Sequence, residues 1–135
     1  MFKRIVLGVD GSEHAMDAVR AAMDLAEKSG GELLIVHVDQ KEQMAEGVTD
    51  QATAAETYVQ GIVELVNEAH VPVTSDLRVA RYQDVAKEIL DAAESFKADT
   101  IVVGSRGLGG LSGLLLGSVA HKVIQRAHCP VLVIR

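Results

Sequence analysis

Three glycines and a serine near the C-terminus have a spacing that could bind an anionic ligand. Two residues separate Gly104 from Gly107, nine residues separate Gly107 from Gly117, and Ser118 follows directly. Glycines let a backbone turn sharply or approach a ligand closely. The free N–H groups at the start of a helix attract phosphate, and a serine hydroxyl can donate one more hydrogen bond. The pattern therefore predicts a phosphate-binding loop, to which Arg106 would add a positive charge.

The same residues have a structural alternative, and three familiar motifs do not fit them. Glycines after a strand also allow close packing, and Ser118 could simply cap a helix. A Walker A loop needs a lysine directly after its second glycine, which this stretch lacks. Counted from Gly107, the dinucleotide fingerprint would need glycine where Ser112 stands. Around Ser105 the first glycine of a G-x-S-x-G hydrolase elbow is misplaced, which disfavours a serine hydrolase.

Four nearly continuous apolar runs predict the strands that must position this loop. They cover residues 4–9, 32–38, 100–104 and 130–134. Such runs are typical of parallel strands that are buried on both faces. A fifth stretch, residues 71–80, mixes apolar and polar side chains, mostly in alternation. It predicts a less buried strand at an edge of the sheet.

Amphipathic segments separate the predicted strands. Apolar residues recur at intervals of three or four, and Gly30 with Gly31 ends the first segment. The resulting order of alternating strands and helices indicates an α/β fold, an open parallel sheet with helices on both faces. The predicted helices cover residues 15–26, about 50–70, 85–96, and a last segment from Leu116 or Gly117 to 127.

The edge position of residues 71–80 favours the strand order 3-2-1-4-5 within a single domain of residues 1–135. In that order the direction of winding reverses between strands 1 and 4. Ligands of such sheets bind at the reversal, outside the carboxyl ends of the strands. Strand 1 ends at Val9 and Asp10, and strand 4 ends at Gly104. The glycine pattern therefore begins where a ligand is expected.

Composition and charge narrow the function classes. The chain has 135 residues, of which only 3% are aromatic, and a net charge of −6 with scattered Lys and Arg, which disfavours nucleic-acid binding. No apolar run approaches the roughly 20 residues that cross a bilayer, and the N-terminus lacks the features of a signal peptide. The single Cys129 rules out an internal disulfide. These features predict a cytoplasmic protein that binds neither nucleic acid nor membrane.

The whole chain resembles the universal stress protein family, specifically its ATP-binding branch. The likeness rests on the G-x2-G-x9-G-S spacing, the opening RIVLGVDGSEHA, the run LLIVHV, the stretch ADTIVVGSRGLGGLSGLLLGSVAHKVI and the ending CPVLVIR. It implies a Rossmann-like fold similar to that of the adenine nucleotide alpha hydrolases. It also implies that the chain binds ATP or another adenine nucleotide, with Mg²⁺ held mainly by the phosphates.

The resemblance further implies which positions form the nucleotide site. Asp10 would face ribose hydroxyls or a phosphate-bound Mg²⁺, although it has an alternative as a helix N-cap with Glu13 in a capping box. The Val38 backbone would read the adenine edge. Family members often carry a hydroxyl at the position of Ala120, so phosphate binding here is expected to be modestly weaker. The implied site comprises Gly8, Val9, Asp10, Val38, Val103, Gly104, Arg106, Gly107, Gly117, Ser118, Val119 and Ala120.

The remaining polar residues have simpler explanations. His37 lies in an apolar run, which favours a hydrogen-bonded core residue over a metal ligand. Cys129 has no second thiol and predicts a packed thiol. Residues 40–52 are polar, which fits a mobile flap beside the ligand and a plain surface loop equally well.

The predicted function is nucleotide-dependent regulation or sensing by a dimer. Residues 130–135 would form an apolar edge strand that pairs with a second copy, as is common in the family. Two other classes stay open. One is a slow ATPase or phosphotransferase, although Arg106 and Asp10 are few charged groups for such a reaction. The other is a nucleotide-free dimeric scaffold, which would usually lack the complete glycine spacing. No catalytic residue, protein metal ligand or regulatory partner is assigned.

Overall fold

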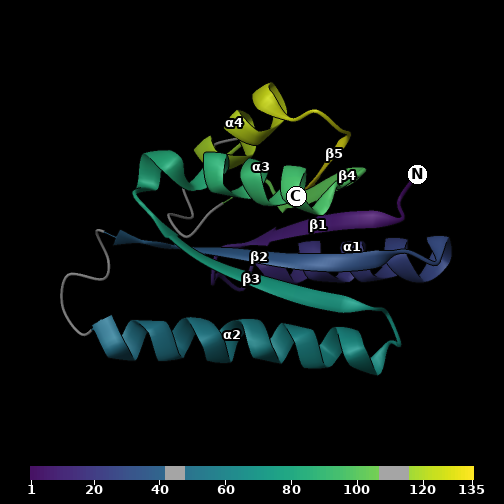
Figure 1. Ribbon diagram of the computed structural model, residues 1–135, viewed down its shortest axis with the longest axis horizontal. Coiled ribbons are helices and arrows are strands. Elements are labelled where there is room, and N and C mark those ends of the chain that lie inside the picture. The colour runs from purple at the N-terminus through teal and green to yellow at the C-terminus, as the bar shows by residue number, and fades with distance from the viewer. Residues whose placement is uncertain (42–47, 107–115) are drawn as a thin grey trace.

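The computed structural model describes residues 1–41, 48–106 and 116–135, with side chains described outside residues 48–52. Strands and helices alternate along the chain, and one short 3-10 helix precedes the third long helix (Figure 1). The elements are β1 (Arg4–Val9), α1 (Ala15–Ser29), β2 (Glu32–Gln40), α2 (Val48–Glu68), β3 (Val73–Ala80), η2 (Tyr82–Asp84), α3 (Val85–Phe96), β4 (Thr100–Gly104), α4 (Ser118–Arg126) and β5 (Val131–Ile134).

The five strands form one parallel sheet in the order β3-β2-β1-β4-β5, which confirms the predicted topology. At the centre of the sheet, Val6 of β1 lies opposite Leu34 of β2 on one side and Ile101 of β4 on the other. The direction of winding therefore reverses between β1 and β4, as expected.

Helices cover both faces of the sheet, with α1 and α2 on one face and α3 and α4 on the other (Figure 1). Alternate residues of β1 point to opposite faces. Ile5 and Leu7 pack with α1 and α2, whereas Val6 packs with α3 and α4. All three side chains are fully buried. Burying one such side chain stabilises a fold by about 1.5–3 kcal/mol, so the central strand makes a large contribution to stability.

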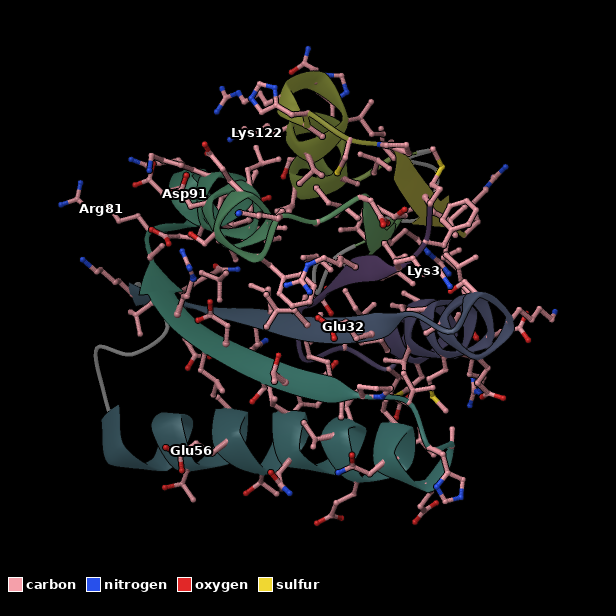
Figure 2. The ribbon with its side chains drawn as sticks, turned by 45° about the vertical axis from the view of Figure 1, so that its right-hand side comes forward. Lys3, Glu32, Glu56, Arg81, Asp91 and Lys122 are labelled. Carbon is pink, nitrogen blue, oxygen red and sulfur yellow. The ribbon has the colours of Figure 1, made fainter. Side chains whose placement is uncertain are left out.

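The helices keep their polar residues on the outer side. Glu56 of α2 is exposed and points away from the sheet (Figure 2), while Val59 and Ile62 of the same helix are buried against it. Within the described residues, no helix combines the length and the apolar character that a membrane span requires.

Two boundaries show how well local signals predicted the elements. Gly30 adopts a left-handed conformation with φ of 71°, and its N–H donates to the Ala26 carbonyl, which confirms the predicted end of the first helix. By contrast, α2 already begins at Val48. The expectation of an irregular segment over residues 40–52 is therefore wrong for 48–52, and residues 42–47 lie outside the described part of the chain.

One carboxylate joins the start of β1 to the start of β4. Asp99 accepts hydrogen bonds from the backbone N–H groups of Phe2 (3.0 Å), Lys3 (2.9 Å) and Arg4 (3.1 Å). Partial burial alone would raise the pKa of Asp99, but these hydrogen bonds outweigh it and the pKa is lowered. The charged carboxylate thus stabilises the entry into the central strand.

Gly31 provides a test of the packing at this end of the sheet. A Cβ added there would lie 2.3 Å from the Phe2 carbonyl oxygen and 3.0 Å from the Lys3 Cα. Because backbone atoms would have to move, we expect Gly31→Ala to lower the free energy of unfolding by about 2 kcal/mol or more in urea denaturation. Gly61→Ala is the matched control, since Gly61 lies inside α2 with nothing within 4 Å of an added Cβ. That variant should gain about 0.5–1 kcal/mol, and equal losses in both would refute the close approach.

Candidate functional site

The site predicted from the glycine pattern lies where β1 and β4 end side by side. Gly8 and Val103 come together there, because a Cβ added at Gly8 would lie 3.2 Å from Val103 Cγ1 and 3.4 Å from Ile89 Cδ1. A larger residue at position 8 would therefore crowd the side chains from β4 and α3. Because Gly8 has no side chain, β4 and α3 can pack closely against the end of β1.

Ser105 ties the two ends of the predicted phosphate loop together. Its N–H donates to the Ile134 carbonyl at 2.7 Å, and its carbonyl accepts from the Gly117 N–H at 2.5 Å. The exit from β4 and the start of α4 are thus adjacent, although a long loop separates them in sequence. Gly104 pairs with Ile134 and is the last residue of β4, which confirms the predicted end of this strand.

The remaining loop residues are placed less completely. Arg106 is exposed just after β4, where its charge is accessible to a ligand. Gly107 lies outside the described residues, so its role stays a prediction.

The start of α4 provides donors for an anion. Gly117 is the N-cap residue in an extended conformation, and Ser118 is the first helical residue, which confirms the predicted start of this helix. Backbone N–H groups in a first helical turn lack intrahelical acceptors. Within the described residues, the N–H groups of Ser118, Val119 and Ala120 donate to no backbone acceptor. These groups, together with the helix dipole, make this end of α4 suited to a phosphate.

Apolar residues of the predicted site gather on the face covered by α3 and α4. Val38, Val103 and Ala120 are buried in one core cluster there, and Val119 packs against it. Val9 differs, since its side chain lies in the cluster on the opposite face with α1 and α2. Only the backbone of Val9 could therefore face a ligand on the side where the others gather.

Asp10 is not the cap of the first helix. Its Oδ1 accepts from the Ser12 N–H at 2.9 Å and from the Ser12 hydroxyl at 2.6 Å. Helix α1 begins only at Ala15, and its N-cap residue His14 makes no side-chain cap. The capping-box alternative with Glu13 is therefore wrong. Asp10 instead shapes the turn after β1 and leaves its carboxylate half-buried at the end of the strand.

A buried histidine supports the neighbouring ends of β1 and β2. His37 Nδ1 lies 2.9 Å from the Val9 carbonyl oxygen, and Nε2 lies 3.0 Å from Asp39 Oδ1. This confirms the expectation of a hydrogen-bonded core residue. Because both partners are acceptors, the ring satisfies them together only when both nitrogens carry protons. His37 and Asp39 face the same side of β2, as residues two apart in a strand do, which is the signal that could have paired them from sequence.

Tyr58 of α2 lies beside this histidine, a contact that sequence reasoning missed. The two rings are 5.6 Å apart between centroids. The Tyr58 hydroxyl is buried and makes no hydrogen bond within the described residues. Burial raises the pKa of Tyr58 to about 12; the nearby Gly11 amide opposes this shift, and the Asp10 charge adds to it. The phenol therefore stays protonated near the end of β1.

Tyr82 is a second residue that sequence reasoning missed. It lies in η2, directly after the edge strand β3, and its hydroxyl hydrogen-bonds with the Ser118 hydroxyl. The signal available from sequence was its position after the carboxyl end of a strand, where ligand-facing residues of parallel sheets gather.

The described residues hold no cluster of metal ligands, and one open pocket of the structure lies away from the predicted site. They contain no group of three or more His, Cys, Asp or Glu that could hold a metal. An open pocket of about 390 Å³ lies near the start of β4 and the end of α4, and none of the predicted site residues lines it. Cys129 borders this pocket; burial, with a contribution from Asp99, raises the pKa of its thiol, which agrees with a packed thiol.

Comparison with known proteins identifies the relatives of this chain. The model of the Universal stress protein family matches residues 1–135. The chain belongs to the universal stress protein family. It is 36% identical over 137 residues to a universal stress protein of Thermus aquaticus, with both chains covered completely.

Solved structures of similar proteins confirm the Rossmann-like fold of this universal stress protein. The protein MJ0577 superposes with a TM-score of 0.88 at 26% identity, over 99% of this chain and 96% of that one. A universal stress protein solved in complex with cAMP superposes with a TM-score of 0.76 at 25% identity, over 98% of this chain and 96% of the other.

The histidine between β1 and β2 can be tested by substitution. We expect His37→Leu to lower the free energy of unfolding by about 1–3 kcal/mol in urea denaturation, because it leaves the Val9 carbonyl and the Asp39 carboxylate without their partner. Asp39→Asn is the control, since an amide oxygen at position 39 can still face the ring, and its loss should be smaller. A His37→Leu variant as stable as the wild type would contradict the supporting role.

Proposed function

We propose that this universal stress protein binds an adenine nucleotide, with ATP as the expected ligand, at the carboxyl ends of β1 and β4. The observation that carries the proposal is the closure of the glycine loop by Ser105 and Gly117 at the point where the winding reverses. Parallel sheets bind ligands at such points. The solved universal stress protein that holds cAMP shows that a relative with this fold accepts an adenine nucleotide.

In this proposal the phosphates lie at the start of α4. The N–H groups of Ser118, Val119 and Ala120 would donate to phosphate oxygens, and the exposed Arg106 would add charge. Gly107 and Gly117 would keep the loop backbone close to the ligand. The Gly117 N–H itself is already used by Ser105, so it contributes conformation and not a donor.

The nucleoside would lie over the ends of β1 and β2. The backbone of Val38 would read the adenine edge, and Val103 with Val119 would supply an apolar wall. Gly8, Gly104 and the Val9 backbone would line the base of the site. Asp10 would face the ribose or a phosphate-bound Mg²⁺. Since the described residues hold no cluster of metal ligands, Mg²⁺ would depend mainly on the phosphate oxygens.

The protein would act as a regulator whose state depends on bound nucleotide. Phosphoryl transfer requires positioned cations and a group that orients the nucleophile. Arg106 and Asp10 are the charged residues assigned to the site, and neither is held by a second charged side chain in the described residues. Binding without rapid turnover suits a sensor that presents a different surface with and without nucleotide.

Nucleotide binding is tested by denaturing the purified protein and identifying any released nucleotide by mass spectrometry, followed by calorimetric titration with ATP and Mg²⁺. We expect ATP binding, and at least about tenfold weaker binding by Gly117→Val, because a branched side chain would stand beside the phosphates. Valine can adopt the backbone of Gly117, whose φ is −70° and ψ 160°, so the fold should persist. Gly61→Ala, in the middle of α2, should bind like the wild type. A wild type that binds no adenine nucleotide would refute the proposal.

We also propose that two copies pair through β5. This strand is an edge of the sheet and is apolar, and Leu132 is 40% exposed. Antiparallel pairing of two such edges would bury these side chains and satisfy the free backbone groups.

Light scattering at micromolar concentration should show a dimer. Leu132→Lys should shift it toward monomer, because a charge on an edge strand opposes pairing. Leu77→Lys places the same charge on the other edge, at a residue with 41% exposure, and should remain dimeric. A monomeric wild type would count against pairing through β5.

A further inference from the structure

Ser118 is the one side-chain hydroxyl in the first turn of α4. Val119 and Ala120 follow it, and neither can donate a side-chain hydrogen bond. If phosphate binds at this helix start, as proposed above, Ser118 is the side chain of that turn that can donate to it. The orientation of its hydroxyl then matters for phosphate affinity.

A short segment from the far edge of the sheet lies against this hydroxyl. Tyr82 of η2, 36 residues earlier in the chain, hydrogen-bonds to Ser118 through its own hydroxyl. Lys122 Nζ donates to the Gln83 carbonyl at 3.5 Å. Ser118 and Lys122 are four residues apart and so occupy the same face of α4. Two contacts therefore place η2 on the face of α4 that carries Ser118.

The chemistry of the ligand fixes the direction of the hydrogen bond between the two hydroxyls. A phosphate oxygen only accepts, so Ser118 must donate its single proton to it. The Ser118 oxygen can then still accept, and Tyr82 must be the donor. A phenol suits this role because its proton is more acidic than that of an alcohol. A chain of hydrogen bonds with one direction strengthens each member.

We propose that Tyr82 is a positioning residue for phosphate recognition. Its hydroxyl donates to Ser118 and holds the Ser118 proton toward the nucleotide phosphate. Tyr82 therefore favours phosphorylated ligands over the bare nucleoside, although it makes no contact with the nucleotide itself. This inference rests on the nucleotide function proposed above and adds a residue from outside the glycine loop.

A double-mutant cycle tests this role, with affinities for ATP and adenosine measured by calorimetry. Tyr82→Phe removes one oxygen from a side chain that is 48% exposed, so the fold should be kept, which thermal unfolding would check. We expect Tyr82→Phe to weaken ATP binding about three- to tenfold and to leave adenosine binding unchanged. Ser118→Ala should weaken ATP binding, and the double variant should be no weaker than Ser118→Ala alone, because Tyr82 acts through Ser118.

Other outcomes separate this inference from the function on which it rests. Additive losses in the double variant, or an equal loss for adenosine, would overturn the role of Tyr82 while leaving nucleotide binding intact. Tighter ATP binding by Tyr82→Phe would overturn it too, since it would mean that Tyr82 holds Ser118 away from the ligand. A wild type that binds neither ATP nor adenosine would refute the nucleotide function itself.

Discussion

The pairing of β1 with strands on both sides is the constraint on which the rest of the structure depends. β2 follows β1 through α1 and lies on one side, whereas β4 lies on the other. Because parallel crossovers are right-handed, adding strands in opposite directions sends helices to opposite faces. α1 and α2 therefore cover one face and α3 and α4 the other (Figure 1). The carboxyl ends of β1 and β4 are left between the two layers, where Ser105 bonds to the start of α4 and Asp10 follows β1.

Sequence patterns were sufficient for the sheet because its three central strands, β1, β2 and β4, are almost wholly buried and therefore apolar. Continuous apolar runs marked β1, β2, β4 and β5, and the mixed pattern of β3 marked an edge, from which the strand order followed. One helix start, that of α2, was predicted less well. The first residues of α2 are mostly polar, so no apolar repeat indicated that the helix begins at Val48. The first helix begins at Ala15, as its apolar spacing predicted, whereas the alternative of a cap at Asp10 is wrong because that carboxylate bonds to Ser12.

In the candidate site, too, residues marked by local sequence patterns could be predicted, whereas residues placed by contacts distant in sequence could not. The ends of the glycine loop could be located because Gly104 and Gly117 flank a strand and a helix that are both evident in the sequence. Tyr58 and Tyr82 could not, because their places depend on how α2 and η2 are rotated against elements far away in the chain. Such contacts have no fixed spacing in sequence. The supporting groups around a site are therefore harder to predict than the loop that touches the ligand.

The hydrogen bonds that the N-terminal backbone donates to Asp99 affect the order in which the chain can fold. The amides of Phe2, Lys3 and Arg4 find their common acceptor 95 to 97 residues later. During synthesis the N-terminal strand emerges first, yet one of its two edges stays unpaired until β4 leaves the ribosome. Closing so long a loop is entropically costly, and contacts between residues so far apart in the chain form slowly. β1 is thus made before the other strands but gains its second neighbour, β4, late. Its open apolar edge must be protected until then.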